Sequence, residues 1–236
     1  MATSSSPLAQ MSQFLMSEID KVNEALRSLQ DNTARKSPLK DWHEDMLYHL
    51  TAEVQLNAGR MYWLLEHREQ SLPTLAYVVR NLLELNVWIK YCCKSQANAH
   101  RFYQNRWRDG KGFQKAIENL VSAIPTVRNT AEIDKALDSF KKTLRETAMA
   151  VGISSLDEDY KRVTSAADEI GLKEFFVAAN TLLSKFAHPT AMTVLTFIKG
   201  EPLDRIFEFL FATGIGLAAA GCQALGKYIS GIAGNA

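Results

Sequence analysis

The 236-residue sequence contains few residues that interrupt helices, with only six prolines and twelve glycines. Neither residue is well tolerated in a helix interior. Almost every apolar pattern in the chain repeats at the helical period, and we find no convincing strand pattern. These absences predict an all-α protein, a single helical bundle of about seven to nine helices.

The sequence also has almost no net charge and only three cysteines. Its 27 basic and 26 acidic residues create no global field for nucleic acid or a membrane, so such binding would need a local patch. Cys92, Cys93 and Cys222 have the spacing of neither a zinc site nor a redox motif. No secretory signal pattern is seen at the start. We therefore expect a cytoplasmic protein that needs no metal or other cofactor.

No change in composition separates two parts of the chain, so we expect one domain over residues 1–236. The first predicted helix, 7–30, is amphipathic. The last, 202–232, is long and apolar enough to raise a membrane span. However, Glu208 lies within it, and its glycines do not form the one-sided stripe of a membrane helix pair. We expect no stable membrane insertion, and expect these two helices to serve in a homo-oligomer.

Glycines and prolines predict where the later helices end. The segment 109–112 is predicted to be a turn between two helices. Gly152 is predicted to close a charged helix, and Gly171 to close a polar helix that begins at Ser155. Pro189 is predicted to stop the next helix, because the residue before a proline avoids the helical conformation.

The helix predicted at 73–95 is apolar on nearly every side, which predicts that it lies at the centre of the bundle. Arg80 and Glu84 lie one turn apart on this helix, beside Tyr77 and Trp88. Charged side chains that leave water need a partner, and Arg before Glu is the less favourable order for an exposed pair. We expect the pair to be buried or to line a cleft. The alternative is an ordinary surface ion pair.

A second group of polar residues, Asn180, Ser184 and His188, recurs every four positions on one face of the helix that precedes Pro189. The helix dipole favours the imidazolium of His188, which suits a general acid or a phosphate-binding group. The alternative is a solvated helix end. A serine hydrolase is disfavoured, because no strand-turn-helix elbow surrounds Ser184. The opposite face is predicted to pack into the core and carries Leu172, Phe175, Ala179, Leu182, Leu183 and Phe186.

These motifs, Arg80-x-x-x-Glu84 followed by an arginine-rich helix and Ser184-Lys-Phe-x-His188-Pro, resemble a family of all-helical bacterial proteins of unknown function. The resemblance covers 72–193. It implies that Arg80, Glu84, Ser184 and His188 meet in one polar site, and these four are the candidate catalytic residues. It implies no reaction.

A third stripe contains His49, Glu53, Arg60 and His67. The Arg60-x6-His67 spacing is similar to the Arg-x(4-6)-His signature of the HEPN helical ribonucleases, although Met61 replaces the usual polar residue after the arginine. This resemblance implies a dimeric, metal-independent ribonuclease in a toxin or phage-defence setting, with Arg60 and His67 as alternative catalytic residues. His49 and Glu53 have the spacing of two metal ligands, but no further ligand follows, so we expect no metal site. The plainer alternative is a partly solvated helix face.

A basic and aromatic segment follows, in which Arg101, Arg106 and Arg108 alternate with Phe102 and Trp107. Such a surface can bind phosphates and stack bases, so these three arginines are candidate nucleic-acid contacts. The alternative is an amphipathic helix whose aromatic residues pack inward. The alternative is favoured, because the rest of the chain is not basic.

Two functional hypotheses follow from these patterns. The first is a helical protein that binds a small ligand or a protein partner at a site formed by Arg80, Glu84 and His188. The second is a HEPN-like ribonuclease that acts on RNA, with His67 or His188 as general acid or base and an arginine that stabilises the charge on the phosphate.

Overall fold

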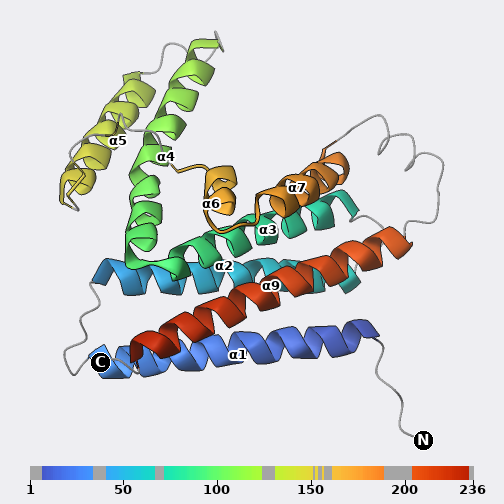
Figure 1. Cartoon of the computed structure of the whole chain (residues 1–236). Helices are drawn as coiled ribbons and strands as arrows, with labels where there is room; N and C mark the ends of the chain where they lie inside the picture. Colours follow the sequence, from blue (N-terminus) through green and yellow to red (C-terminus); the bar gives the residue numbers. More distant parts are fainter. Residues whose placement is uncertain are drawn as a thin grey trace, which may run out of the picture. The chain divides into compact units, whose positions relative to one another are not determined.

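In the computed structural model, every regular element of the described residues is a helix (Figure 1). The described residues are 7–33, 41–66, 72–123, 131–150, 152–153, 156, 161–188 and 204–233. The helices are α1 (Pro7–Thr33), α2 (Asp41–Glu66), α3 (Leu72–Lys94), α4 (Gln96–Ala123), α5 (Ala131–Ala150), α6 (Val163–Glu169), α7 (Lys173–Ala187) and α9 (Asp204–Ala233). The prediction of an all-α protein is confirmed.

Contacts within the chain group the helices into two compact units. The larger unit comprises 1–96 and 163–236 and contains α1, α2, α3, α6, α7 and α9. The smaller unit comprises 97–162 and contains α5 and nearly all of α4. The expectation that residues 1–236 form one domain stays a prediction.

Helix α3 is the centre of the larger unit, because it packs against α2, α6, α7 and α9. Val78, Val79 and Val87 are all buried, although Val78 and Val87 project from opposite sides of the helix and Val79 lies between them. Burying each such side chain contributes about 1.5–3 kcal/mol relative to leaving it in water. The prediction that the apolar helix at 73–95 is central is therefore confirmed.

Helix α9 packs against α1, α2 and α3, and two of its glycines permit a close approach. A Cβ atom on Gly214 would lie 2.6 Å from Met61 Sδ and 3.0 Å from Val79 Cγ2. A Cβ atom on Gly221 would lie 3.1 Å from Ile89 Cδ1. These glycines lie two helical turns apart, so they line the face of α9 that packs into the core.

The apolar composition of α9 resembles that of a membrane-spanning helix. In the described part of the chain, α9 is the one helix long and apolar enough to cross a membrane, and half of its apolar stretch is buried inside the protein. A buried core helix of a soluble protein can be as long and as apolar as a membrane-spanning helix. The expectation that α9 does not insert stably into a membrane stays a prediction.

The predicted turn at 109–112 is wrong, because α4 continues through this segment without interruption. Gly110 lies against α5, where an added Cβ would lie 2.7 Å from Leu144 Cδ1. Nearby, Trp107 Nε1 donates a hydrogen bond to Thr147 Oγ1 at 2.9 Å, and an ion pair of 2.8 Å joins Lys141 to Glu118. Gly110 therefore serves helix packing and does not break the helix.

The polar helix that precedes Gly171 begins later than Ser155, because α6 starts at Val163. The buried side chain of Asn105 accounts for the delay: its Nδ2 donates to Lys161 O, and its Oδ1 accepts from Lys161 N, both at 2.9 Å. The backbone N–H and C=O of Lys161 therefore bond to a side chain, and this residue is not helical. Gly171 adopts a φ of +73° at the end of α6, as its predicted role as a helix stop requires.

We expect a leucine at Gly214 to lower the free energy of unfolding by about 1–3 kcal/mol, because its side chain must enter space that Met61 and Val79 already fill. Gly216→Leu is the matched control, since no atom of the described chain lies within 4 Å of a Cβ at this exposed position of the same helix. Urea unfolding followed by circular dichroism measures both variants. Equal destabilisation by the two leucines would contradict the close approach at Gly214.

Candidate functional site

Helices α3 and α7 bring four polar side chains together, and we call Arg80, Glu84, Asn180 and His188 the Arg80 cluster. Arg80 Nε donates a hydrogen bond to Asn180 Oδ1 at 2.9 Å. The same Nε lies 3.5 Å from Glu84 Oε1. Arg80 Nη1 lies 3.5 Å from His188 Nε2. Three of the four predicted site residues thus converge, although the two helices lie about a hundred positions apart in the sequence.

The orientation of α7 explains why Asn180 reaches Arg80. Phe176 and Leu183 are the buried residues of α7, and Asn180 lies on the same face at helical spacing. The predicted core face is therefore partly wrong, since Phe175 is 53% exposed and Leu182 is 44% exposed. Both possible faces of α7 contain phenylalanine and leucine, and packing against α3 selects the one that includes Asn180.

The end of α7 places His188 beside the guanidinium. His188 is the C-terminal cap of α7 and has an extended backbone with φ −110° and ψ 149°, as expected for the residue before a proline. Its N–H donates to Ser184 O at 3.3 Å. In the described chain, no hydrogen bond joins the hydroxyl of Ser184 to the Arg80 cluster. Ser184 therefore positions the histidine through its backbone.

The ion pair between Arg80 and Glu84 is intermediate in exposure between a buried pair and an ordinary surface pair, the two alternatives considered from the sequence. The side chains of Arg80 and Glu84 are 28% and 36% exposed. Solvent screens a pair at this exposure, so the pair contributes at most about 1 kcal/mol to stability. The shorter hydrogen bond from Arg80 to Asn180 therefore does more to fix the guanidinium.

The contact between Arg80 and His188 depends on the protonation of the histidine. Arginine can only donate hydrogen bonds, so His188 accepts through Nε2 only when its ring is neutral and the proton is on Nδ1. A protonated ring would present a second cation to Arg80. Because His188 is exposed, its ring can leave Arg80 and donate to a bound group instead.

The predicted alternative catalytic pair and the predicted metal ligands belong to α2 and to the residues that follow it. Arg60 is exposed on α2, and His67 lies outside the described residues. His49 is exposed and forms an ion pair of 3.2 Å with Asp45 when protonated. Among the described residues, no group of three or more His, Cys, Asp or Glu side chains has the arrangement of a metal site.

The candidate nucleic-acid arginines lie on α4 in the smaller unit. Arg101 and Arg106 are exposed, and Arg108 is half-buried. Trp107 is buried in a small core and contacts the ring of Tyr103 edge-on. The aromatic residues therefore pack inward, as in the alternative of an ordinary amphipathic helix. Arg101 and Arg106 still face water.

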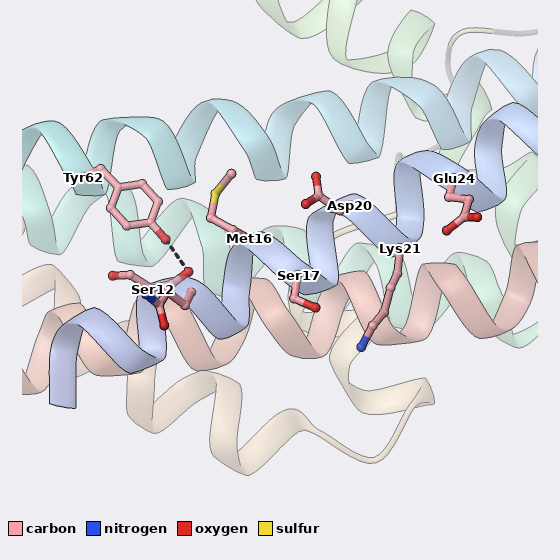
Figure 2. Close-up of a pocket in the computed structure, with 8 residues that line it drawn as sticks. Ser12, Met16, Ser17, Asp20, Lys21, Glu24 and Tyr62 are labelled. Carbon is pink, nitrogen blue, oxygen red and sulfur yellow. Dashed lines mark hydrogen bonds between the residues drawn. The ribbon is translucent and has the colours of Figure 1, made fainter. Parts of the chain in front are cut away.

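One groove was not predicted from the sequence. It has a volume of about 520 Å³ and lies along α1, with Tyr62 contributed by α2 (Figure 2). Tyr62 donates a hydrogen bond to Ser12 O at 3.0 Å across it. The other lining residues are Gln13, Met16, Ser17, Asp20, Lys21 and Glu24. In the sequence these residues form the polar side of an amphipathic helix, which gives no sign of a groove.

The three cysteine thiols have raised pKa values. Burial raises the pKa of Cys93 and of Cys222 to about 12. Burial also raises the pKa of Cys92 well above its usual value. All three thiols therefore stay protonated near neutral pH and are poor nucleophiles.

His43 is a buried histidine that the sequence analysis did not identify. It is 1% exposed, stacks on Trp42, and has its Nε2 3.2 Å from the hydroxyl of Tyr228. Burial lowers the pKa of His43 below its ordinary value, because a charged ring would lose its hydration. This histidine belongs to the packing between α2 and α9.

The fold and the Arg80 cluster thus define an all-α protein with a half-exposed polar site between two helices. Residues 44–205 match a protein family described as a family of unknown function (DUF5677). The match covers more than half of the chain and includes all of α3 and α7, so the chain belongs to this family. The predicted resemblance to a family of unknown function is confirmed, whereas the match gives no support to the HEPN resemblance. Comparisons with curated proteins and with solved structures gave no match.

We expect His43 to make the protein less stable in mild acid. As the pH falls through the ordinary histidine pKa of 6.5, the unfolded chain binds a proton that the folded chain does not, so the free energy of unfolding decreases. The decrease stops below the folded-state pKa. Because His43→Gln cannot take up this proton, its Tm should fall less than the wild-type Tm between about pH 8 and pH 5. Thermal melts at both pH values measure this difference, and equal falls would contradict the assignment.

Proposed function

We propose that the protein binds a small ligand or a segment of a protein partner at the Arg80 cluster, and that Arg80 recognises a carboxylate or phosphate of that ligand. The observation that carries this proposal is the fixed but accessible guanidinium. Arg80 Nε is held by Asn180 Oδ1 at 2.9 Å, while 28% of the arginine side chain remains exposed. A guanidinium oriented before binding loses less freedom when a ligand arrives.

The hydrogen-bonding capacity of the Arg80 cluster favours an anionic group. In the described chain, Nε of Arg80 faces Asn180 and Glu84, Nη1 faces His188, and Nη2 has no partner. Guanidinium nitrogens bind carboxylate and phosphate oxygens in a planar fork. His188 is exposed beside this fork and becomes a second donor when it turns away from Arg80.

Glu84 limits the kind of ligand that this cluster accepts. Its carboxylate lies 3.5 Å from Arg80 Nε and is 36% exposed, so it reduces the attraction of a purely anionic ligand. It also offers an acceptor to a cationic group of the same ligand. A ligand that carries both an anion and an amine satisfies both residues, as an amino acid does. We also propose that the protein is cytoplasmic, in line with its composition, and that it forms a homo-oligomer, as expected from its amphipathic first helix and its apolar last helix.

We expect glycine, which carries a carboxylate and an ammonium group, to shift backbone amide resonances of α3 and α7 in NMR spectra in a saturable manner. Asn180→Ala should weaken this binding by about tenfold, because the guanidinium loses its main anchor. Arg80→Gln should remove the response. Arg205→Gln, at an exposed arginine of α9, is the matched control and should bind like wild type. Identical titrations by wild type and Arg80→Gln would reject the site, and acetate and inorganic phosphate provide the same comparison without an amine.

A second candidate function is metal-independent cleavage of RNA, of the HEPN-like kind expected in a toxin or phage-defence system. The observation that favours it is the exposed His188 whose Nε2 lies 3.5 Å from Arg80 Nη1. A histidine that moves a proton beside an arginine that stabilises phosphate charge is sufficient for this chemistry.

If this second function is correct, the purified protein cleaves single-stranded RNA in the presence of EDTA. His188→Ala should reduce cleavage by about 100-fold or more, because the proton donor is lost, while the Tm stays close to that of wild type. The double variant Arg60→Gln, His67→Ala tests the alternative catalytic residues, and it should lose cleavage if Arg60 and His67 act in place of Arg80 and His188. Absence of cleavage, or cleavage that none of these variants affects, would eliminate the ribonuclease hypothesis.

A further inference from the structure

The outward side of α2 carries an apolar surface that the described residues of the larger unit leave exposed. Tyr48, Leu56 and Trp63 are 56%, 48% and 58% exposed. At about 100° per residue they share an arc of about 80° with Ala52 and Gly59. We call these five residues the outer stripe of α2. Exposed apolar residues that are scattered singly are ordinary, but several on one stripe mark an interaction surface.

We propose that the outer stripe of α2 is the interface with a second copy of this chain, and that the two α2 helices pair antiparallel about a two-fold axis near Leu56. The stripe has nearly the same pattern in both directions. In this arrangement Tyr48 faces Trp63 of the second copy, Ala52 faces Gly59 of the second copy, and the two Leu56 side chains meet at the axis. A two-fold interface requires this self-complementarity.

Gly59 supports this pairing because no contact among the described residues requires a glycine there. No atom of these residues lies within 4 Å of the position of its Cβ, and glycine in a helix interior costs about 1 kcal/mol relative to alanine. Opposite Ala52 of the second copy, a glycine allows the two helix axes to approach closely. The aromatic residues at 48 and 63 then cover the two ends of the contact.

The charges beside the outer stripe select the antiparallel orientation. Glu53 and Arg60 are exposed on the same flank of the stripe and lie seven residues apart, too far along the helix to pair with each other. An antiparallel pair places Glu53 opposite Arg60 of the second copy on that flank, and the symmetry makes this contact twice. A parallel two-fold pair would place this flank of the two copies on opposite sides of the contact, so Glu53 of one copy could not meet Arg60 of the other.

The expected assembly is a reversible dimer, because one pair of helices is a small interface. Sedimentation velocity of the full chain from about 1 to 500 μM should show a concentration-dependent change from monomer to dimer. Leu56→Glu should raise the dissociation constant by about tenfold or more, because two carboxylates meet at the axis. Phe175→Glu is the matched control, since Phe175 is similarly exposed on α7, and it should dimerise like wild type.

Charge reversal tests the orientation. Glu53→Arg and Arg60→Glu should each weaken the dimer, because each places like charges opposite each other. The double variant that carries both changes should restore the wild-type dissociation constant. A monomer at all concentrations would overturn the proposal, as would a dimer that Leu56→Glu leaves unchanged. A double variant no better than the single variants would overturn the antiparallel pairing. Arg80→Gln should dimerise normally, so this proposal stands or falls independently of ligand binding at the Arg80 cluster.

Discussion

The larger unit depends on one constraint: a helix that is apolar on nearly every side must be covered on nearly every side. Val78 and Val87 of α3 project from opposite sides of the helix, Val79 lies between them, and all three are buried, so α3 needs α2, α6, α7 and α9 around it. Burial of apolar surface is the dominant favourable contribution to folding. The close approach of α9 at Gly221 and the hydrogen bond of 2.8 Å from Asn86 Nδ2 to Leu217 O both follow from this cover.

The candidate site lies where this cover changes from apolar to polar. Arg80 cannot enter the apolar core without a partner, and α7 offers Asn180 at the point where Arg80 meets it. The guanidinium is held at the edge of the core, half in contact with water. The same packing that stabilises α3 therefore orients the arginine. This coupling allows a polar site to be well positioned without being deeply buried.

The sequence is sufficient to predict the helices and the central position of α3, because period and spacing act locally. The meeting of Arg80, Glu84 and His188 follows only from the family resemblance, since the two helices lie about a hundred positions apart. Features that depend on neighbouring helices are not predictable in this way. Gly110 resembles a turn residue until Leu144 of α5 is seen beside it. Likewise, α7 has two apolar faces, and only contact with α3 shows that Phe176 is buried while Phe175 is exposed. The groove along α1 needs Tyr62 of another helix.

The same reasoning applies to α2, which is also apolar on two sides. Its inner side supplies core residues such as Leu47, Val54 and Met61, while Leu56 and Trp63 remain exposed on the outer stripe. A helix with one apolar side is satisfied by its own unit, whereas a second apolar side is stabilised only by a further partner. In the sequence, Glu53 and Arg60 make this outer side resemble a solvated face. Their opposite charges at self-complementary positions instead fit the two-fold contact proposed for the outer stripe.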